Sequence, residues 1–257
     1  MEKIQQALEQ ARRQREGKSP RTSAGPAVPK VIEYTQTQSV PGAIDVMREK
    51  RLVSAMTQNE YTDSLKILST QVLQRLEEHH WSTLAVTSPR ADMGKTTVAI
   101  NLGLSIAREV DYTVLVVDAN LRKPELHEYF GIKPDAGLSD YLSGDLELSN
   151  VLVNPKGINH FVLLPAGTPT VLSSELLKSP KMCSLVEELS SRYPKRIIIF
   201  DLPSVLETAD ALSFMPCVDA ALLVIEDDET KEADLKAAVD MLSVTNIIGT
   251  VLNKSII

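Results

Sequence analysis

The sequence predicts an α/β protein built on a mostly parallel sheet with helices on both faces. Six short apolar runs have the length and composition of buried strands, and helical segments separate most of them. A polar Gly-Lys-Thr-Thr segment follows the first run, and an aspartate ends two of the others. Ligands of such folds bind at the carboxyl ends of the strands. The pattern therefore predicts a single ligand site at that edge of the sheet.

The first 45 residues differ in composition from the rest. Residues 1–16 predict a short helix whose narrow apolar stripe consists of Ile4, Leu8 and Ala11. Residues 17–45 contain four prolines among Ser, Thr, Gly and Gln, which is typical of a flexible linker. We therefore expect an N-terminal helix and disordered linker over 1–45 and a folded domain over 46–257.

Helices and strands are expected to alternate in the folded domain. Residues 61–78 predict an amphipathic helix, because their leucines and valine recur at three- and four-residue spacing. A second helix is expected at 96–108, directly after the first strand. The expected strands are 83–88, 113–119, 160–166, 196–201, 220–226 and 247–253.

Composition excludes several classes of protein. The chain has 257 residues and a formal net charge of −7, and this acidic balance argues against a nucleic-acid partner. Its two cysteines, Cys183 and Cys217, have no C-x-x-C pairing and are interpreted as small buried residues in a reducing compartment. No apolar run reaches the roughly 18 residues that a membrane span requires. There is no apolar core of a signal peptide near the N-terminus, so we expect a cytoplasmic protein.

A phosphate-binding loop is predicted at residues 88–97. Gly94, Lys95, Thr96 and Thr97 lie directly after a strand and before a helix, where backbone N–H groups and the helix dipole attract phosphate. Lys95 would reach the β- and γ-phosphates of a nucleotide, and the Thr96 hydroxyl would bind Mg²⁺.

This loop departs from the usual motif. Pro89 occupies the position five residues before Gly94, where the motif has glycine, and Asp92 places a negative charge beside the expected phosphate. Two like charges about 4 Å apart repel by about 4 kcal/mol at an effective dielectric near 20. Asp92 must therefore point outward, be paired, or weaken nucleotide binding, and Arg90 is a candidate partner for it.

Acidic residues end two of the expected strands. Asp118 ends the run TVLVVD, and Asp201 ends RIIIFD. One such aspartate is often only a helix cap, but two on strands near a phosphate loop are better explained as ligands of Mg²⁺ and its water. Arg122 follows Asp118 by four residues, so it could contact phosphate, fix the loop, or lie on the surface.

Four segments in order resemble the bacterial tyrosine kinases of capsule and exopolysaccharide synthesis, which are related to the deviant Walker ATPases of the ParA and MinD types. The similarity extends from about Asp63 to the end of the sequence. The segments are SPRADMGKTTVAINLGLSIA, VLVVDANLRKPELHEYFGI, RIIIFDLPSVLETADAL and IIGTVLNKS.

The resemblance implies a P-loop nucleotide-binding domain of the deviant Walker type at 46–257, with ATP and Mg²⁺ as cofactors. Gly94–Thr97 match the end of the Walker A motif, Asp118 the first acid of the A′ motif and Asp201 the Walker B acid. Asn253 matches the asparagine that recognises adenine, which an amide can do because it both donates and accepts. The implied catalytic residues are Lys95, Asp118 and Asp201, the metal ligands are Thr96, Asp118 and Asp201, and the ATP-binding residues are Met93, Gly94, Lys95, Thr96, Thr97, Arg122 and Asn253.

The sequence also departs from the family pattern. Asn120 replaces the second aspartate of the A′ motif, Ala91-Asp92 replaces Pro-Gly, and Leu202 replaces the Thr or Ser after the Walker B acid. The oligomerisation motif Glu-x-x-Arg-x-x-Arg is reduced to Asp63, Lys66 and Ser69. After KSII no tyrosine-rich tail follows, so we do not expect autophosphorylation on a C-terminal cluster.

Three functions remain open from the sequence. The first is an ATP-dependent protein-tyrosine kinase that regulates assembly or export of an exopolysaccharide or capsule. The second is a nucleotide-binding protein with little or no turnover that acts as partner of a membrane chain-length protein. The third is a ParA/MinD-like positioning ATPase, which the arginine at position 90 disfavours because that class has a lysine there. We expect a membrane-anchored polysaccharide chain-length (co-polymerase) protein to recruit the chain to the inner face of the membrane, and a homo-oligomer remains an alternative.

Overall fold

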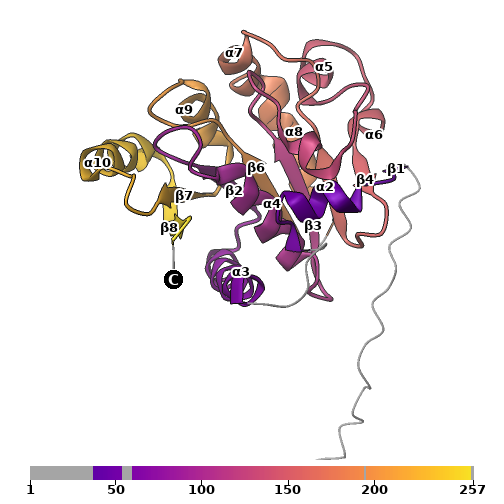
Figure 1. Cartoon of the computed structure of the whole chain (residues 1–257). Coiled ribbons are helices and arrows are strands. Elements are labelled where there is room, and N and C mark those ends of the chain that lie inside the picture. The colour runs from indigo at the N-terminus through magenta and orange to yellow at the C-terminus, as the bar shows by residue number, and fades with distance from the viewer. Residues whose placement is uncertain (1–36, 54–59, 194, 256–257) are drawn as a thin grey trace, which may run out of the picture. The chain divides into compact units, whose positions relative to one another are not determined.

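The computed structural model describes residues 37–53, 60–193 and 195–255, so the helix expected at 1–16 lies outside the described residues. Eight strands form one sheet in the order β1-β4-β5-β3-β6-β2-β7-β8 (Figure 1). Neighbouring strands are parallel except for the pair β4 and β5. The strands are β1 (Gln38–Val40), β2 (Thr83–Thr87), β3 (Thr113–Asp118), β4 (Val153–Pro155), β5 (Phe161–Leu164), β6 (Arg196–Asp201), β7 (Ala220–Glu226) and β8 (Asn246–Asn253).

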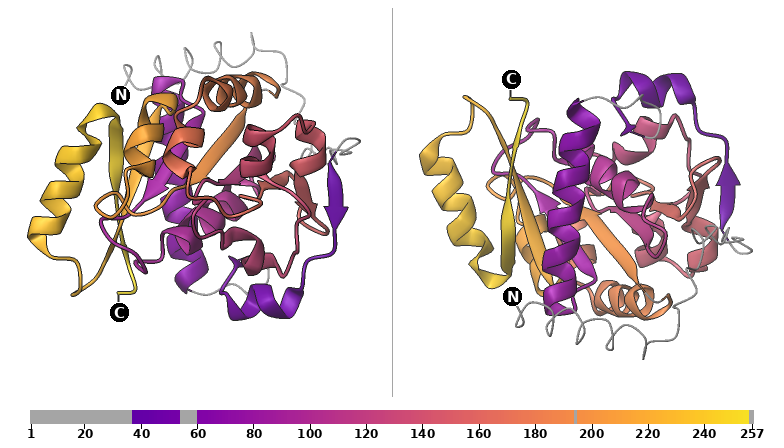
Figure 2. Two further views of the ribbon diagram at one scale, coloured as in Figure 1. Left: turned by 90° about the horizontal axis from the view of Figure 1, so that it is seen from above. Right: turned by 90° about the horizontal axis from the view of Figure 1, so that it is seen from below.

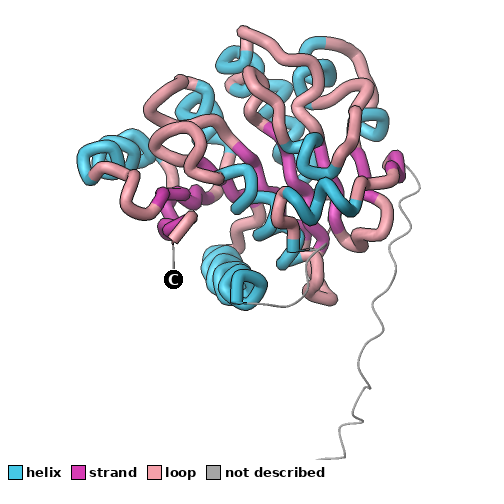
Figure 3. The backbone as a smooth tube through the Cα atoms, in the orientation of Figure 1, coloured by secondary structure: helices cyan, strands magenta, loops and turns pink. Residues whose placement is uncertain are grey.

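Helices and short 3₁₀ turns connect these strands, and Figure 3 shows the strands as an inner layer between them. The α-helices are α2 (Ile44–Glu49), α3 (Glu60–His79), α4 (Lys95–Ile106), α5 (Leu138–Ser143), α6 (Leu148–Val151), α7 (Ser173–Leu177), α8 (Pro180–Ser191), α9 (Asp210–Phe214) and α10 (Glu232–Met241). The 3₁₀ turns are η2 (Leu126–Phe130), η3 (Met215–Cys217) and η4 (Leu242–Val244).

The sheet separates two apolar cores. Successive residues of a strand point to opposite faces, so Leu84 and Val86 lie in one core and Ala85 lies in the other. Helices α2, α3 and α4 contribute to the first core, whereas α8, α9 and α10 contribute to the second (Figure 2). Both faces of the sheet are covered, as the near-continuous apolar strands predict.

The helix α4 has more buried residues than any other described helix. Ten of its residues are buried, because it lies between the sheet and α3. Gly103 allows this close approach, since a Cβ at that position would lie 2.8 Å from Val116 Cγ2 and 3.1 Å from Phe161 Cε2. The sequence of α4 is correspondingly apolar, with neither an acid nor a base after Lys95 until the helix ends.

The six expected strands and both expected helices are present, with ends that differ by a few residues. The structure differs from the predicted linker at residues 37–45, where β1 pairs with β4 and α2 begins. A strand of three residues with mostly polar side chains has too little apolar pattern to be visible in the sequence. The strand β4, with the sequence Val-Asn-Pro, was missed because three residues are too few to show a strand pattern.

The two cysteines are not separate in the structure. Cys183 of α8 and Cys217 of η3 have Cα atoms 5.6 Å apart and are joined in a disulfide, so their interpretation as unpaired residues is wrong. Sequence spacing could not reveal this, because the pairing depends on how α8 and η3 pack. Within the described residues, no helix combines the length and the apolar composition needed to cross a bilayer.

We predict that Gly103→Val destabilises the protein by about 1–3 kcal/mol, the usual cost of overpacking a close-packed core. The new methyl groups would collide with β3, against which α4 packs. Urea unfolding would measure the loss. Gly249→Ala is the matched control, because nothing lies within 4 Å of its added Cβ. Equal stability of Gly103→Val and the wild-type protein would contradict the packing described here.

Candidate functional site

The expected site forms at the carboxyl ends of three adjacent strands. β6 lies between β2 and β3, and the register places Asp118 of β3 directly beside Asp201 of β6. The loop after β2 is the predicted phosphate loop. The prediction that the runs TLAVTS, TVLVVD and RIIIFD cluster at one edge is therefore confirmed.

The phosphate loop leads directly into the start of α4. Gly94 is the residue before this helix and has a φ of +83°, and a Cβ there would lie only 2.1 Å from Asn253 Nδ2. Among the described side chains none caps α4, and its first turn contains no acid. The positive end of the helix and the half-buried Lys95 are thus available to an anion such as phosphate.

Thr96 and Asp201 are joined below this loop. The Thr96 hydroxyl donates to Asp201 Oδ2 over 2.7 Å, and both residues are buried. The second carboxylate oxygen, Asp201 Oδ1, is buried without a hydrogen-bond partner among the described atoms. A hydroxyl and a carboxylate with an unused oxygen fit Mg²⁺, which keeps several waters and takes its other ligands from phosphate.

Asp118 is fully buried and holds the loop that follows β3. Its Oδ1 accepts the N–H of Asn120 over 3.1 Å, and its Oδ2 accepts the N–H groups of Glu125 and Leu126 over 3.2 and 3.1 Å. The side chain therefore caps this loop as well as lying beside Asp201.

The two neighbouring carboxyls are costly to ionise together. Burial, and then the charge of Asp201, raise the pKa of Asp118 to about 8, against the effect of its three backbone hydrogen bonds. Burial also raises the pKa of Asp201 to about 6, although Lys95 and the Thr96 hydroxyl act in the opposite direction. A cation between the two carboxylates would remove this penalty.

Arg122 is engaged by a buried acid. Its Nε and Nη2 donate to the two carboxylate oxygens of Asp210 over 2.8 and 3.1 Å, and the Ser174 hydroxyl also donates to Asp210. Although burial opposes it, these hydrogen bonds lower the pKa of Asp210. Of the roles open to Arg122, the structure supports fixing the loop after β3 against α9.

Asn253 contacts the phosphate loop itself. Its Nδ2 donates to the carbonyl oxygen of Met93 over 2.9 Å, beside Gly94. The Met93 side chain is buried, with its sulfur accepting from the Thr230 hydroxyl over 3.7 Å. Met93 can therefore face a ligand only through its backbone.

Sequence reasoning missed several contacts of the loop. Arg90 pairs with Asp234 and not with Asp92, so the partner expected for Asp92 is wrong. The Ala91 N–H donates to Glu207 Oε1, and the Thr97 hydroxyl meets the Tyr129 hydroxyl at 3.1 Å. Each of these pairs joins residues at least 32 positions apart, so no local sequence signal could have identified them.

Comparison with known proteins finds tyrosine-protein kinases. YwqD of Bacillus subtilis (strain 168) is 28% identical over 210 residues, which cover 80% of this chain and 87% of YwqD. Etk of Escherichia coli (strain K12) is 31% identical over 193 residues, which cover 74% of this chain. The chain thus spans about a quarter of the length of Etk, 26%, but most of YwqD. No family model matches the chain.

Solved structures confirm the predicted P-loop fold. The kinase domain of VpsO has a TM-score of 0.68 and 28% identity, over 76% of this chain and 97% of that domain. The septum site-determining protein MinD of Pyrococcus horikoshii OT3, complexed with Mg-ADP, has a TM-score of 0.54 and 25% identity, over 66% of this chain and 69% of MinD. The chain is therefore also similar in fold to MinD, one of the deviant Walker ATPases.

Metal-free protein should lose stability as the pH rises from about 4 to about 8, the range set by the raised pKa values of Asp201 and Asp118. The folded state keeps protons that the unfolded chain has already released above about pH 4. Asp201→Asn removes one of these carboxyl groups and the like charge beside the other. This variant should therefore lose less stability than the wild-type protein as the pH rises. Thermal unfolding between pH 4 and pH 8 without Mg²⁺ or nucleotide would measure both.

The exposed acid Asp145 provides the control for this experiment. Asp145→Asn should follow the wild-type pH dependence, because no buried charge is removed. If Asp201→Asn lost stability with pH as steeply as wild type and this control, the assigned effect of the buried pair would be wrong.

Proposed function

The chain is a relative of the bacterial tyrosine-protein kinases, and from this relationship we propose that it is an ATP-binding, kinase-like protein of exopolysaccharide or capsule synthesis. It would transfer the γ-phosphoryl group of ATP to a tyrosine of a protein. The observation that supports this best is the hydrogen bond from Thr96 to Asp201. Thr96 directly follows Lys95 in the sequence, and Asp201 lies beside Asp118 in the sheet. The uncapped start of α4 supports a phosphate ligand at the same place.

Each residue of the site has a role in this proposal. Backbone N–H groups at the start of α4 bind the phosphates, and Lys95 supplies positive charge where negative charge develops. Thr96 and Asp201 would hold Mg²⁺, which would neutralise negative charge on the phosphates. Asp118 holds the loop after β3 in place and adds negative charge beside the metal position. Asn253 would contact the adenine base through the part of its amide that does not bond Met93.

We further propose a membrane-anchored polysaccharide chain-length protein as partner, which would recruit the chain to the inner, cytoplasmic face of the membrane. The support is the resemblance of the sequence to the tyrosine kinases of capsule and exopolysaccharide synthesis, together with the reduced oligomerisation motif. Ser69 is buried and its hydroxyl bonds the Lys66 carbonyl and the Ser105 hydroxyl, so it offers no charged contact to another copy.

A second candidate is a nucleotide-binding partner of such a protein with little or no turnover. The observation that favours it is Asn120, which stands where the family has a second acid. Its N–H donates to Asp118, and its Oδ1 accepts the Lys123 N–H over 3.4 Å. An amide there adds no negative charge for a metal or for a reacting hydroxyl. Phosphate release by the purified protein with Mg-ATP separates the two candidates.

Lys95→Ala should weaken Mg-ATP binding by about 10- to 100-fold, the usual worth of a charged hydrogen-bond donor. Isothermal titration calorimetry would measure the dissociation constant. Lys178→Ala is the control, because Lys178 is exposed and follows the last residue of α7, outside the loop of residues 88–97. Unchanged affinity in Lys95→Ala would remove this loop from the nucleotide site.

For the partner, we expect the intact chain to bind the cytoplasmic segment of a polysaccharide chain-length protein more tightly with Mg-ATP than without it. Surface plasmon resonance with that segment immobilised would show the difference. A chain lacking residues 1–36 tests whether the N-terminal part contributes, since the described fold begins after it. Absence of binding by both chains, with and without ATP, would contradict this proposal.

A further inference from the structure

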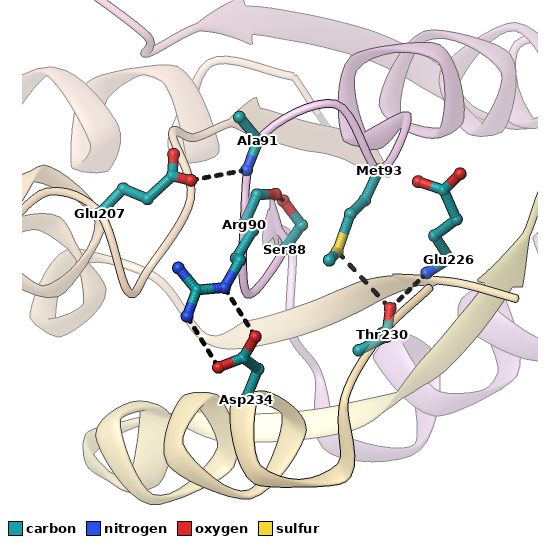
Figure 4. Close-up of polar contacts among 8 residues, drawn as sticks. All are labelled: Ser88, Arg90, Ala91, Met93, Glu207, Glu226, Thr230 and Asp234. Carbon is teal, nitrogen blue, oxygen red and sulfur yellow. Dashed lines mark hydrogen bonds and ion pairs between the residues drawn. The ribbon is translucent and has the colours of Figure 1, made fainter. Parts of the chain in front are cut away.

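The phosphate loop is held from the side of β7, α10 and β8 by a set of side chains that we call the clasp. It consists of Glu226, Thr230, Asp234 and Lys254. Figure 4 shows three of these residues around the loop, with Arg90, Ala91 and Met93 directed toward their partners. None of the four was identified from the sequence as part of the site.

The first contact of the clasp is a two-pronged ion pair. Arg90 Nε and Nη2 donate to the two carboxylate oxygens of Asp234 over 2.6 and 2.8 Å (Figure 4). Asp234 lies in the first turn of α10, and its side chain is 18% exposed. Because Asp234 takes two donors of Arg90, the guanidinium is directed toward α10 and ties the loop to that helix.

The second contact anchors the backbone of Asp92, the residue that departs from the usual motif. Lys254 Nζ donates to the Asp92 carbonyl oxygen over 2.7 Å and pairs with Glu226 over 2.9 Å. Its ammonium therefore lies beside the residue whose negative charge opposes phosphate. The Asp92 side chain itself is exposed.

The third contact fixes the next residue of the loop. The Thr230 hydroxyl donates to the Met93 sulfur and accepts the N–H of Glu226 over 2.8 Å, so it joins the end of β7 to the loop (Figure 4). On the opposite side, Glu207 accepts the Ala91 N–H over 3.1 Å. Residues 90–93 are thus held from both sides by side chains distant in sequence.

The loop has a conformational reason to need such support. Asp92 has a φ of +62°, in the left-handed region that glycine occupies without steric cost and other residues disfavour. The family pattern has Pro-Gly where this chain has Ala91-Asp92. Aspartate adopts this region more readily than most residues other than glycine, but still at a conformational cost that surrounding contacts can offset.

We propose that the clasp positions the phosphate loop for nucleotide, with Asp234 and Lys254 acting as positioning residues through Arg90 and Asp92. The inference rests on the proposed nucleotide site and adds to it the contacts that substitute for the missing glycine. It also assigns Arg90 to the support of the loop, because its guanidinium is bound by Asp234. If Arg90 instead bound phosphate directly, removal of Asp234 would free the guanidinium and ATP would bind more tightly.

A double-mutant cycle on Arg90 and Asp234 separates these alternatives. Asp234→Ala, Arg90→Ala and the double variant should each weaken Mg-ATP binding by about fivefold, the upper range for an exposed ion pair of good geometry. The double variant should lose no more than either single variant, because the pair acts as one unit. Asp234→Glu should recover most of the affinity, and Lys254→Met should weaken binding to a similar extent.

The matched control is Glu188→Gln. It breaks an exposed ion pair with Arg192 on α8, which does not touch the loop, and should leave ATP affinity unchanged. Tighter or unchanged binding by Asp234→Ala would overturn the clasp. Losses in the two single variants that multiply in the double variant would also overturn it, because Arg90 and Asp234 would then act independently.

The clasp can be tested even if the wild-type protein binds no nucleotide. That finding would refute the proposed function but not the clasp. Hydrogen exchange of the nucleotide-free protein then tests the clasp directly. Peptides covering residues 88–94 should exchange about fivefold faster in Asp234→Ala than in wild type or Glu188→Gln. Equal exchange in the three proteins would overturn the inference.

Discussion

The parallel pairing of β3 with β6 is the constraint on which the site depends. It places two buried carboxyls, Asp118 and Asp201, side by side at the edge of the sheet. Such a pair is unfavourable in a protein interior unless other groups compensate for it. Backbone N–H groups bond Asp118, the Thr96 hydroxyl bonds Asp201, and Lys95 lies close enough to lower the pKa of Asp201. The remaining penalty is the physical reason to expect a cation there.

The conformation of the phosphate loop is determined partly by its own residues and partly by side chains distant in sequence. Gly94 is required locally, because a side chain there would collide with Asn253. At Asp92 the local backbone preference is not met, and contacts from α10 and from the end of β8 accompany the strained conformation. The loop can therefore match the phosphate-loop motif at one end and depart from it at the other, since tertiary contacts can stabilise the part that departs.

The sequence could predict those parts of the protein whose determinants are local. Apolar runs of strand length and the position of Lys95 between a strand and a helix identify the fold and the loop without knowledge of packing. Pairings such as Arg122 with Asp210 or Cys183 with Cys217 could not be predicted, because each depends on which helices become neighbours. The edge strand β1 was missed because three largely polar residues form a strand only where β4 offers free backbone groups.

The enclosure of α4 has a mechanical consequence. A helix buried over ten of its residues, and in close contact with β3 at Gly103, cannot tilt or slide without disturbing the core on which it rests. Thr96 and Asp201 therefore belong to one stiff frame. Movements that accompany ligand binding or release should therefore meet less resistance in the loops that follow β2 and β3 than in this frame.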